Sequence, residues 1–191
     1  MTDDARRDEP FKRLFFALDC PPPLRKAIAQ WRADLRLRTG KAVPADNFHL
    51  TLLFLGAVPL AQIHEVCEAA GKVRTPGEPL KLALDRLQVW HRAGVLALAP
   101  DQAPQVLLRL AYGLEQAMLP FGFEEAAHEF RPHLTLARDY RAPEPESATP
   151  PAFFLRAERF ALFESHKGRY RILQDWPLTK KKKKGARGRL K

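Results

Sequence analysis

One four-residue motif, His-Leu-Thr-Leu, occurs twice in the sequence, at residues 49–52 and again at residues 133–136. In both copies a polar residue alternates with an apolar one, which is the pattern of a half-buried β-strand. Side chains at positions i and i+2 share one face of a strand. Each copy therefore places an imidazole beside a hydroxyl on one face and turns two leucines toward a core. Two such strands set together would face two histidines and two threonines across one groove.

The paired histidines, His49 and His133, suit acid–base catalysis. Imidazole has an unperturbed pKa of about 6.5, so it both takes and gives protons near neutral pH. One ring can accept a proton from a nucleophile while the other donates a proton to a leaving oxygen. The hydroxyls of Thr51 and Thr135 donate hydrogen bonds without adding charge, which suits the non-bridging oxygens of a phosphate held between the imidazoles.

A fixed positive charge accompanies only the second copy of the motif. Arg138 follows His133 by five residues, and Phe54 holds the equivalent place after His49. A guanidinium can bind phosphate oxygens through two parallel hydrogen bonds. An odd offset puts Arg138 on the opposite face of a regular strand, so it reaches the groove only if the strand ends, twists or bulges near Ala137.

Two other interpretations of the motif remain open from the residues alone. A single His-x-Thr in a strand is a chance event, whereas two copies in apolar strand context are far less expected by accident. Two histidines can also bind zinc. No Cys, Asp or Glu lies near either motif at a typical ligand spacing, however, and threonine is a poor zinc ligand. We expect no metal here.

Length and composition indicate a folded protein of one domain or two closely packed lobes, because 191 residues with 46% hydrophobic content can build a core. No apolar run approaches the ~18 to 20 residues that a membrane span needs. Residues 1–10 are charged and lack the apolar stretch of a signal peptide. Cys20 and Cys67 are expected to be free thiols in a reducing compartment, so we predict a cytoplasmic protein without membrane contact.

The net charge of +10 is concentrated at one end of the chain. Residues 179–191 carry eight positive charges and no acidic residue, which leaves the rest of the chain at only +2. Such a segment is either a solvated, solubilising tail or a loose contact for nucleic-acid phosphates, and the latter would weaken with salt.

The motif strands require supporting elements, and the hydrophobic pattern predicts an α+β fold with helices outside. Residues 1–10 are expected to be disordered, residues 11–178 to form one bilobal domain, and residues 179–191 to be a disordered tail. The repeated motif indicates an internal duplication into two similar lobes, each an antiparallel sheet with outer helices, with the motif strands central.

The predicted helices cover residues 24–37 (ended by Gly40), 60–73 and 103–119. The predicted strands cover residues 13–19, 48–55 (closed by Gly56), 80–84, 87–90, 95–99, 133–137, 153–163 and 170–176. Turn residues between them predict two hairpins, one that pairs residues 87–90 with 95–99 and one that pairs residues 153–163 with 170–176.

The sequence resembles the 2H phosphoesterase superfamily, which is named for two His-x-Thr/Ser motifs. Within it, the chain is most similar to the RNA 2′,3′-cyclic phosphodiesterases, also called 2′-5′ RNA ligases. The resemblance runs over most of residues 12–178 and does not include the basic tail. The segments that carry it are residues 13–18, 47–56, 131–138, 164–165, 169–170 and 176–178.

This resemblance implies a two-lobed fold with the histidines facing each other across a central cleft, and no metal or nucleotide cofactor. The implied substrate is RNA or a nucleotide with a 2′,3′-cyclic phosphate end, and the implied product is a 2′-phosphate. His133 is then the general base and His49 the general acid, while Thr51, Thr135 and Arg138 hold the phosphate. The residues themselves are symmetric about which histidine is the acid.

The resemblance also implies ligation, in which an RNA 5′-hydroxyl replaces water and forms a 2′-5′ phosphodiester without ATP. We expect hydrolysis to dominate, because ligation needs a positioned second strand. We expect a monomer. Two alternatives stay open: a non-catalytic protein that binds RNA ends, and a 2H phosphodiesterase that acts on another small cyclic phosphate, such as ADP-ribose 1″,2″-cyclic phosphate.

Overall fold

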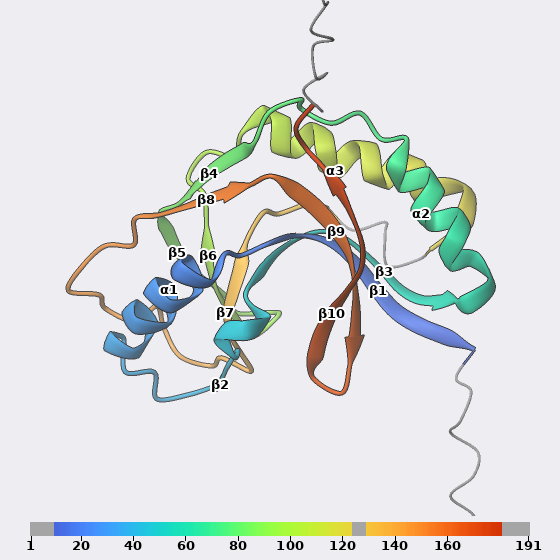
Figure 1. Ribbon diagram of the computed structural model, residues 1–191. Coiled ribbons are helices and arrows are strands. Elements are labelled where there is room, and N and C mark those ends of the chain that lie inside the picture. The colour runs from blue at the N-terminus through green and yellow to red at the C-terminus, as the bar shows by residue number, and fades with distance from the viewer. Residues whose placement is uncertain (1–9, 124–128, 181–191) are drawn as a thin grey trace, which may run out of the picture.

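The computed structural model describes residues 10–123 and 129–180 (Figure 1). The predicted disorder at residues 1–10 and 179–191 falls almost wholly outside these ranges. None of the described helices has the length and apolar character that a membrane-spanning helix needs. The elements are, in chain order, β1 (Phe11–Asp19), α1 (Pro22–Asp34), β2 (Lys41–Ala42), η1 (Ala45–Asn47), β3 (His49–Pro59), η2 (Leu60–Gln62), α2 (Ile63–Gly71), β4 (Leu80–Leu84), β5 (Arg86–Trp90), β6 (Val95–Ala99), α3 (Gln105–Met118), η3 (Leu119–Phe121), β7 (Leu134–Arg138), β8 (Phe153–Ala157), β9 (Arg159–His166) and β10 (Arg169–Pro177).

Two four-stranded antiparallel sheets form the two lobes, with strand orders β10-β9-β1-β3 and β2-β7-β6-β5. The first motif strand, β3, pairs with β1, and the second, β7, pairs with β6. Each sheet also takes strands from the other end of the chain, because β9 pairs with β1 and β2 pairs with β7. The two lobes are therefore interleaved. The two-lobed α+β fold is confirmed.

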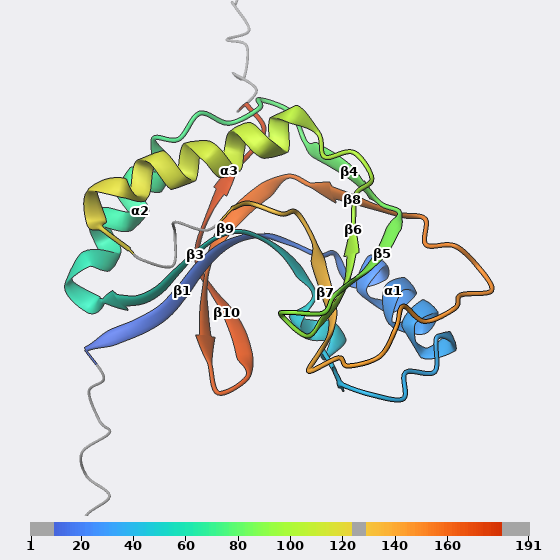
Figure 2. The ribbon, with the colours of Figure 1, turned by 180° about the vertical axis from the view of Figure 1, so that it is seen from behind.

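The helices also cross between the lobes. Helix α1 contacts η1 and β8, and its Arg32 donates a hydrogen bond to the backbone oxygen of Leu136 in β7. Helix α3, from the second half of the chain, contacts α2 and the first motif strand β3. Figures 1 and 2 show α2 and α3 together along one side of the molecule, with α1 beside the sheet that contains β7.

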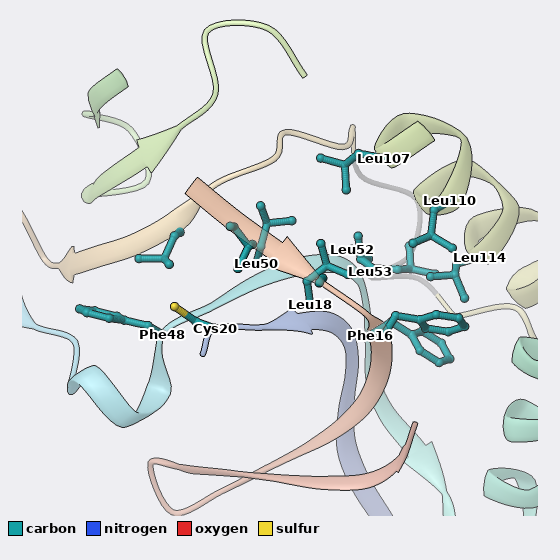
Figure 3. Close-up of a cluster of buried hydrophobic side chains, with 14 of the residues drawn as sticks. Phe16, Leu18, Cys20, Phe48, Leu50, Leu52, Leu53, Leu107, Leu110 and Leu114 are labelled. Carbon is teal, nitrogen blue, oxygen red and sulfur yellow. The ribbon is translucent and has the colours of Figure 1, made fainter. Parts of the chain in front are cut away.

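The buried core lies between the sheets and these helices. Figure 3 shows leucines of β3 beside side chains of β1 and below the apolar face of α3. The motif leucines are part of this core, since Leu50, Leu52, Leu134 and Leu136 are each at most 2% exposed. The alternation in the motif thus predicts its buried face correctly. Other large core side chains are Phe16, Leu18, Phe48, Leu107, Leu110 and Leu114.

Two glycines have other roles than the sequence predicts. Helix α1 ends at Asp34, before the expected residue 37, and Arg36 just after it has a φ of 50°. Gly40 therefore does not cap the helix. A Cβ on Gly40 would lie 2.8 Å from the backbone oxygen of Arg138, so glycine allows the close approach of this loop to β7. Gly56, expected to close the first motif strand, lies inside β3 with a φ of 73°.

The hairpin of β5 with β6 is confirmed, and so is the pairing of β9 with β10. Two further predictions about strands were wrong. Residues 153–163 form parts of two strands, interrupted at Glu158, and β8 pairs with β4 whereas β9 pairs with β1. The motif strands were both expected to be central. β7 is an inner strand of its sheet, but β3 is an edge strand.

Candidate active site

The first catalytic candidate, His49, is oriented by the short turn that precedes it. Its Nδ1 lies 2.7 Å from the backbone oxygen of Asn47 in η1, and Phe48 between them is buried in the core. A carbonyl oxygen only accepts, so Nδ1 must donate its hydrogen, and the neutral ring has a free lone pair on Nε2. The hydroxyl of Thr51 lies 2.8 Å from Nε2 and donates to it in this state.

His133 is held in the same way. Its Nδ1 lies 2.7 Å from the backbone oxygen of Arg131, again two residues upstream, so Nδ1 donates and Nε2 carries the lone pair. Among residues 10–123 and 129–180, no hydrogen bond joins His133 to Thr135, in contrast to the bond between His49 and Thr51. Both histidines thus present an unprotonated Nε2, and only that of His49 is already engaged.

Both motif strands contain a β-bulge at the fourth residue of the motif. In β3, Thr51 lies opposite Ala17 and Leu53 lies opposite Phe16, so Leu52 is an extra residue. In β7, Thr135 lies opposite Ala97 and Ala137 lies opposite Leu96, so Leu136 is an extra residue. Such a bulge shifts the alternation of side chains by one position.

The bulge in β7 resolves the parity of Arg138. Because the bulge shifts the alternation by one position, Arg138 lies on the same face of β7 as Thr135. This is the bulge near Ala137 that the sequence requires if Arg138 is to reach the groove between the motif strands. Arg138 is exposed, while Ala137 before it is fully buried. The bulge in β3 acts likewise on Phe54, which is 45% exposed although the residues on either side of it are buried.

The electrostatics connect His49, His133 and Arg138. Burial lowers the pKa of His49 to about 4, and the charge of Arg138 and that of His133 when protonated also lower it, against a raising effect of the Asn47 carbonyl and Asp19. Burial also lowers the pKa of His133, again with a contribution from Arg138. One guanidinium therefore acts on both imidazoles, and without a bound anion the site favours neutral rings.

Aromatic rings flank both histidines. The ring centroid of Phe15 lies 4.9 Å from that of His49, and Tyr170 meets His49 edge-on at 5.1 Å. Trp90 meets His133 edge-on at 4.4 Å. The sequence gives no signal for the placement of Tyr170 or Trp90, because it depends on the pairing of β9 with β1 and of β6 with β7.

A cavity of about 370 Å³ opens beside His49, lined by Asn47, Tyr170 and the ion pair of Asp19 with Arg25, whose atoms are 2.6 Å apart. This volume falls within the range of small-molecule sites. Within the described residues, no three His, Cys, Asp or Glu side chains gather as a metal site would require. The arrangement offers proton acceptors, hydroxyls and a cation, which suits an anionic ester.

Comparisons with known proteins agree with this chemistry. The family model described as LigT like Phosphoesterase matches residues 18–97 and 98–173. The RNA 2′,3′-cyclic phosphodiesterase of Escherichia coli K12 is 37% identical over 175 residues, which cover 88% of this chain and 97% of that protein. The protein of the same name from Thermus thermophilus is 32% identical over 165 residues, covering 80% and 81%.

Solved structures show the same likeness. The crystal structure of Escherichia coli LigT complexed with 3′-AMP superposes with a TM-score of 0.80 at 35% identity, covering 89% of this chain and 99% of that one.

Proposed function

The chain belongs to the LigT-like phosphoesterase family, and from this premise we propose that it hydrolyses the 2′,3′-cyclic phosphate of RNA or nucleotide ends to a 2′-phosphate. The resemblance first seen in the two motifs is thereby confirmed. The observation that carries the proposal is the shared geometry of His49 and His133, each with Nδ1 hydrogen-bonded to a backbone oxygen and Nε2 unprotonated.

In the proposed reaction, Nε2 of His133 takes a proton from water as the water oxygen attacks phosphorus. The bond between phosphorus and O3′ breaks, and His49 gives its proton to O3′. The phosphate stays on O2′. His133 ends protonated and His49 neutral, and exchange with solvent restores both. Thr51, Thr135 and Arg138 hold the phosphate oxygens and balance the charge that grows in the transition state.

His49 must carry a proton to act as the acid, although its pKa in the free protein is about 4. The charges of the free protein therefore do not select His49 as the acid, and this assignment rests on the family resemblance. A cyclic phosphate monoanion bound beside both rings supplies a negative charge that raises their pKa values. Protonated Nε2 then donates, so the Thr51 hydroxyl has to turn its own hydrogen away.

The same site supports ligation when an RNA 5′-hydroxyl takes the place of water, giving a 2′-5′ phosphodiester without ATP. Hydrolysis has the advantage unless a second strand is positioned. Contact of the basic tail with nucleic acid, a monomeric state and a cytoplasmic location remain predictions.

The test is hydrolysis of 2′,3′-cyclic AMP in the presence of EDTA. We expect activity to survive the chelator and to give only the 2′-phosphate. His49→Ala and His133→Ala should each lower kcat/KM by at least ~100-fold, the lower end for lost acid–base catalysis. His64→Ala is the matched control, because His64 is exposed and its ion-pair partner among the described residues is Glu68 on α2.

Retained activity in either active-site variant would refute the proposed roles. The double variant His49→Ala/His133→Ala should be little worse than either single one, because residues that act as a unit are not additive. Binding of cyclic-ended RNA with no turnover would favour the non-catalytic alternative. A higher rate on ADP-ribose 1″,2″-cyclic phosphate would favour the other one.

A further inference from the structure

A groove of about 710 Å³ lies between helix α3 and the loop that joins α2 to β4. Its charged lining side chains are Arg74, Arg109 and Lys180, all exposed. No described Asp or Glu lines it, and within residues 10–123 and 129–180 none of the three cations forms an ion pair. The groove therefore presents three positive charges that no carboxylate of the described residues pairs with.

Close packing fixes the spacing of the groove walls. The residues of α3 that line it, Val106, Arg109, Leu110 and Gly113, follow the i, i+3, i+4, i+7 spacing of one helix face. A Cβ on Gly113 would lie 3.0 Å from Cγ1 of Val73, so the loop packs directly against the helix. Arg74 follows Val73 in the loop, and Arg109 lies on the facing helix. The two arginines therefore line the groove from two walls that are packed against each other.

Lys180 is held in the groove by the backbone. The Gly77 N–H donates to the oxygen of the fully buried Leu178 at 2.9 Å, and the Lys180 N–H donates to the oxygen of Gly77 at 3.3 Å. A Cβ on Gly77 would lie 3.1 Å from Cε of Lys180, so this side chain lies across the glycine. Lys180 is also the first of five consecutive lysines in the sequence.

The groove is far from His49. Strand β10 has nine residues, and at about 3.3 Å per residue it spans roughly 26 Å. Tyr170, near its start, contacts His49, whereas Lys180 follows its end. Figures 1 and 2 show the β9–β10 turn on the opposite side of the molecule from α2 and α3. A mononucleotide at His49 cannot touch the groove, but a longer chain can reach both.

We propose that this groove is a second RNA-binding site, which holds backbone phosphates of the substrate at a distance from its cyclic end. The proposal rests on the proposed function, because that function makes RNA the substrate. Each cation that meets a phosphate releases a condensed counterion, so binding is sensitive to salt and indifferent to base sequence. The groove thereby distinguishes an RNA from a mononucleotide that has the same cyclic end.

The test compares two substrates, a twelve-nucleotide RNA with a 2′,3′-cyclic phosphate and 2′,3′-cyclic AMP, with the full chain. The groove variant combines Arg74→Gln, Arg109→Gln and Lys180→Gln. The control combines Arg36→Gln, Arg38→Gln and Lys26→Gln, which removes two arginines and one lysine at exposed positions near α1.

The ratio of KM for the RNA to KM for the mononucleotide should rise at least tenfold in the groove variant, with the same kcat on both substrates as the wild type. In the groove variant, the slope of log KM for the RNA against log salt concentration should fall by about 2, because three phosphate contacts are lost and each contributes ~0.7 on a single strand. An unchanged ratio, or an equal rise in the control, would overturn the proposal.

A failure of the proposed function gives a different result. If the wild type hydrolyses neither substrate, the groove is judged by fluorescence anisotropy with a labelled twelve-nucleotide RNA that ends in a 3′-hydroxyl. A Kd at least tenfold higher for the groove variant than for the control supports the site, and equal Kd values refute it.

Discussion

At the scale of single residues, the free protein lowers the pKa of both histidines for the same physical reason, so both rings favour the neutral form at neutral pH. Burial is the main cause of each lowered pKa, and Arg138 adds to the effect on both rings. The reaction needs one proton on the pair, on the general acid, and none on the general base. The number of protons that the two histidines carry must therefore differ between the free protein and its complex with the substrate.

This difference predicts the pH dependence of hydrolysis. Both pKa values lie below 6.5, so the singly protonated free enzyme becomes scarcer as the pH rises above them, about tenfold per pH unit. The kcat/KM for 2′,3′-cyclic AMP should have its maximum below pH 6.5. The kcat maximum should lie at higher pH, because the bound anion raises both pKa values. Profiles of both constants from about pH 4 to 9 check this.

Arg138→Gln serves as the companion variant for these profiles. Removing the guanidinium removes a charge that lowers both pKa values, so the kcat/KM maximum should move to higher pH while its height falls. A profile of unchanged shape would mean that Arg138 does not act on the imidazoles.

At the scale of elements, the turn before β3 and the β9–β10 hairpin position His49 together. The Asn47 backbone oxygen holds Nδ1 of His49, and the Asn47 side chain donates to the oxygen of Gly168 in the hairpin turn at 3.0 Å. Tyr170, on the same hairpin, contacts the His49 ring. The turn and the hairpin are far apart in sequence, and the side-chain amide of Asn47 links them.

Asn47→Ala tests this connection. The variant keeps the backbone oxygen but loses the bond to Gly168, which is worth about 0.5–1.5 kcal/mol. We expect kcat for 2′,3′-cyclic AMP to fall about three- to tenfold and amide exchange in residues 166–170 to become faster. Faster exchange with an unchanged kcat would show that the hairpin does not position His49.

The sequence predicts what local patterns determine. The motif strands, their buried leucines, the three helices and the β5–β6 and β9–β10 hairpins follow from periodicity and turn residues, and the need for a bulge near Ala137 follows from parity. The pairing of β9 with β1 and of β2 with β7 could not be predicted, because it depends on contacts between distant segments. For the same reason the sequence alone does not place Tyr170 and Trp90 beside the histidines.

At the scale of the whole molecule, charge and catalysis are separated. Beside the two imidazoles the described residues place Arg138 and an Arg25 that is paired with Asp19, while most of the net charge of +10 belongs to residues 179–191. The interleaved sheets support the prediction that residues 11–178 act as one domain.

Deletion of residues 181–191 tests that separation. The cut begins after Lys180 because the backbone of Lys180 is bonded to Gly77. It removes seven positive charges, those of Lys181 to Lys184, Arg187, Arg189 and Lys191. Hydrolysis of 2′,3′-cyclic AMP should be unchanged, whereas affinity for RNA should fall and depend less on salt. Loss of hydrolysis of the small substrate would contradict the separation.

The sheet with β3 contains strands from both ends of the described chain, and this determines when the active site can form during synthesis. In the first sheet β9 lies between β1 and β10, and Arg13 pairs with Ser165. Such long-range pairing is slow to form, and domains fold as their segments leave the ribosome. The sheet that supports His49 lacks two of its four strands until β9 and β10 have been synthesised. Catalytic competence therefore arises only after β9 and β10 have been made, and a chain that stops before β9 contains both histidines but not the complete sheet that supports the first.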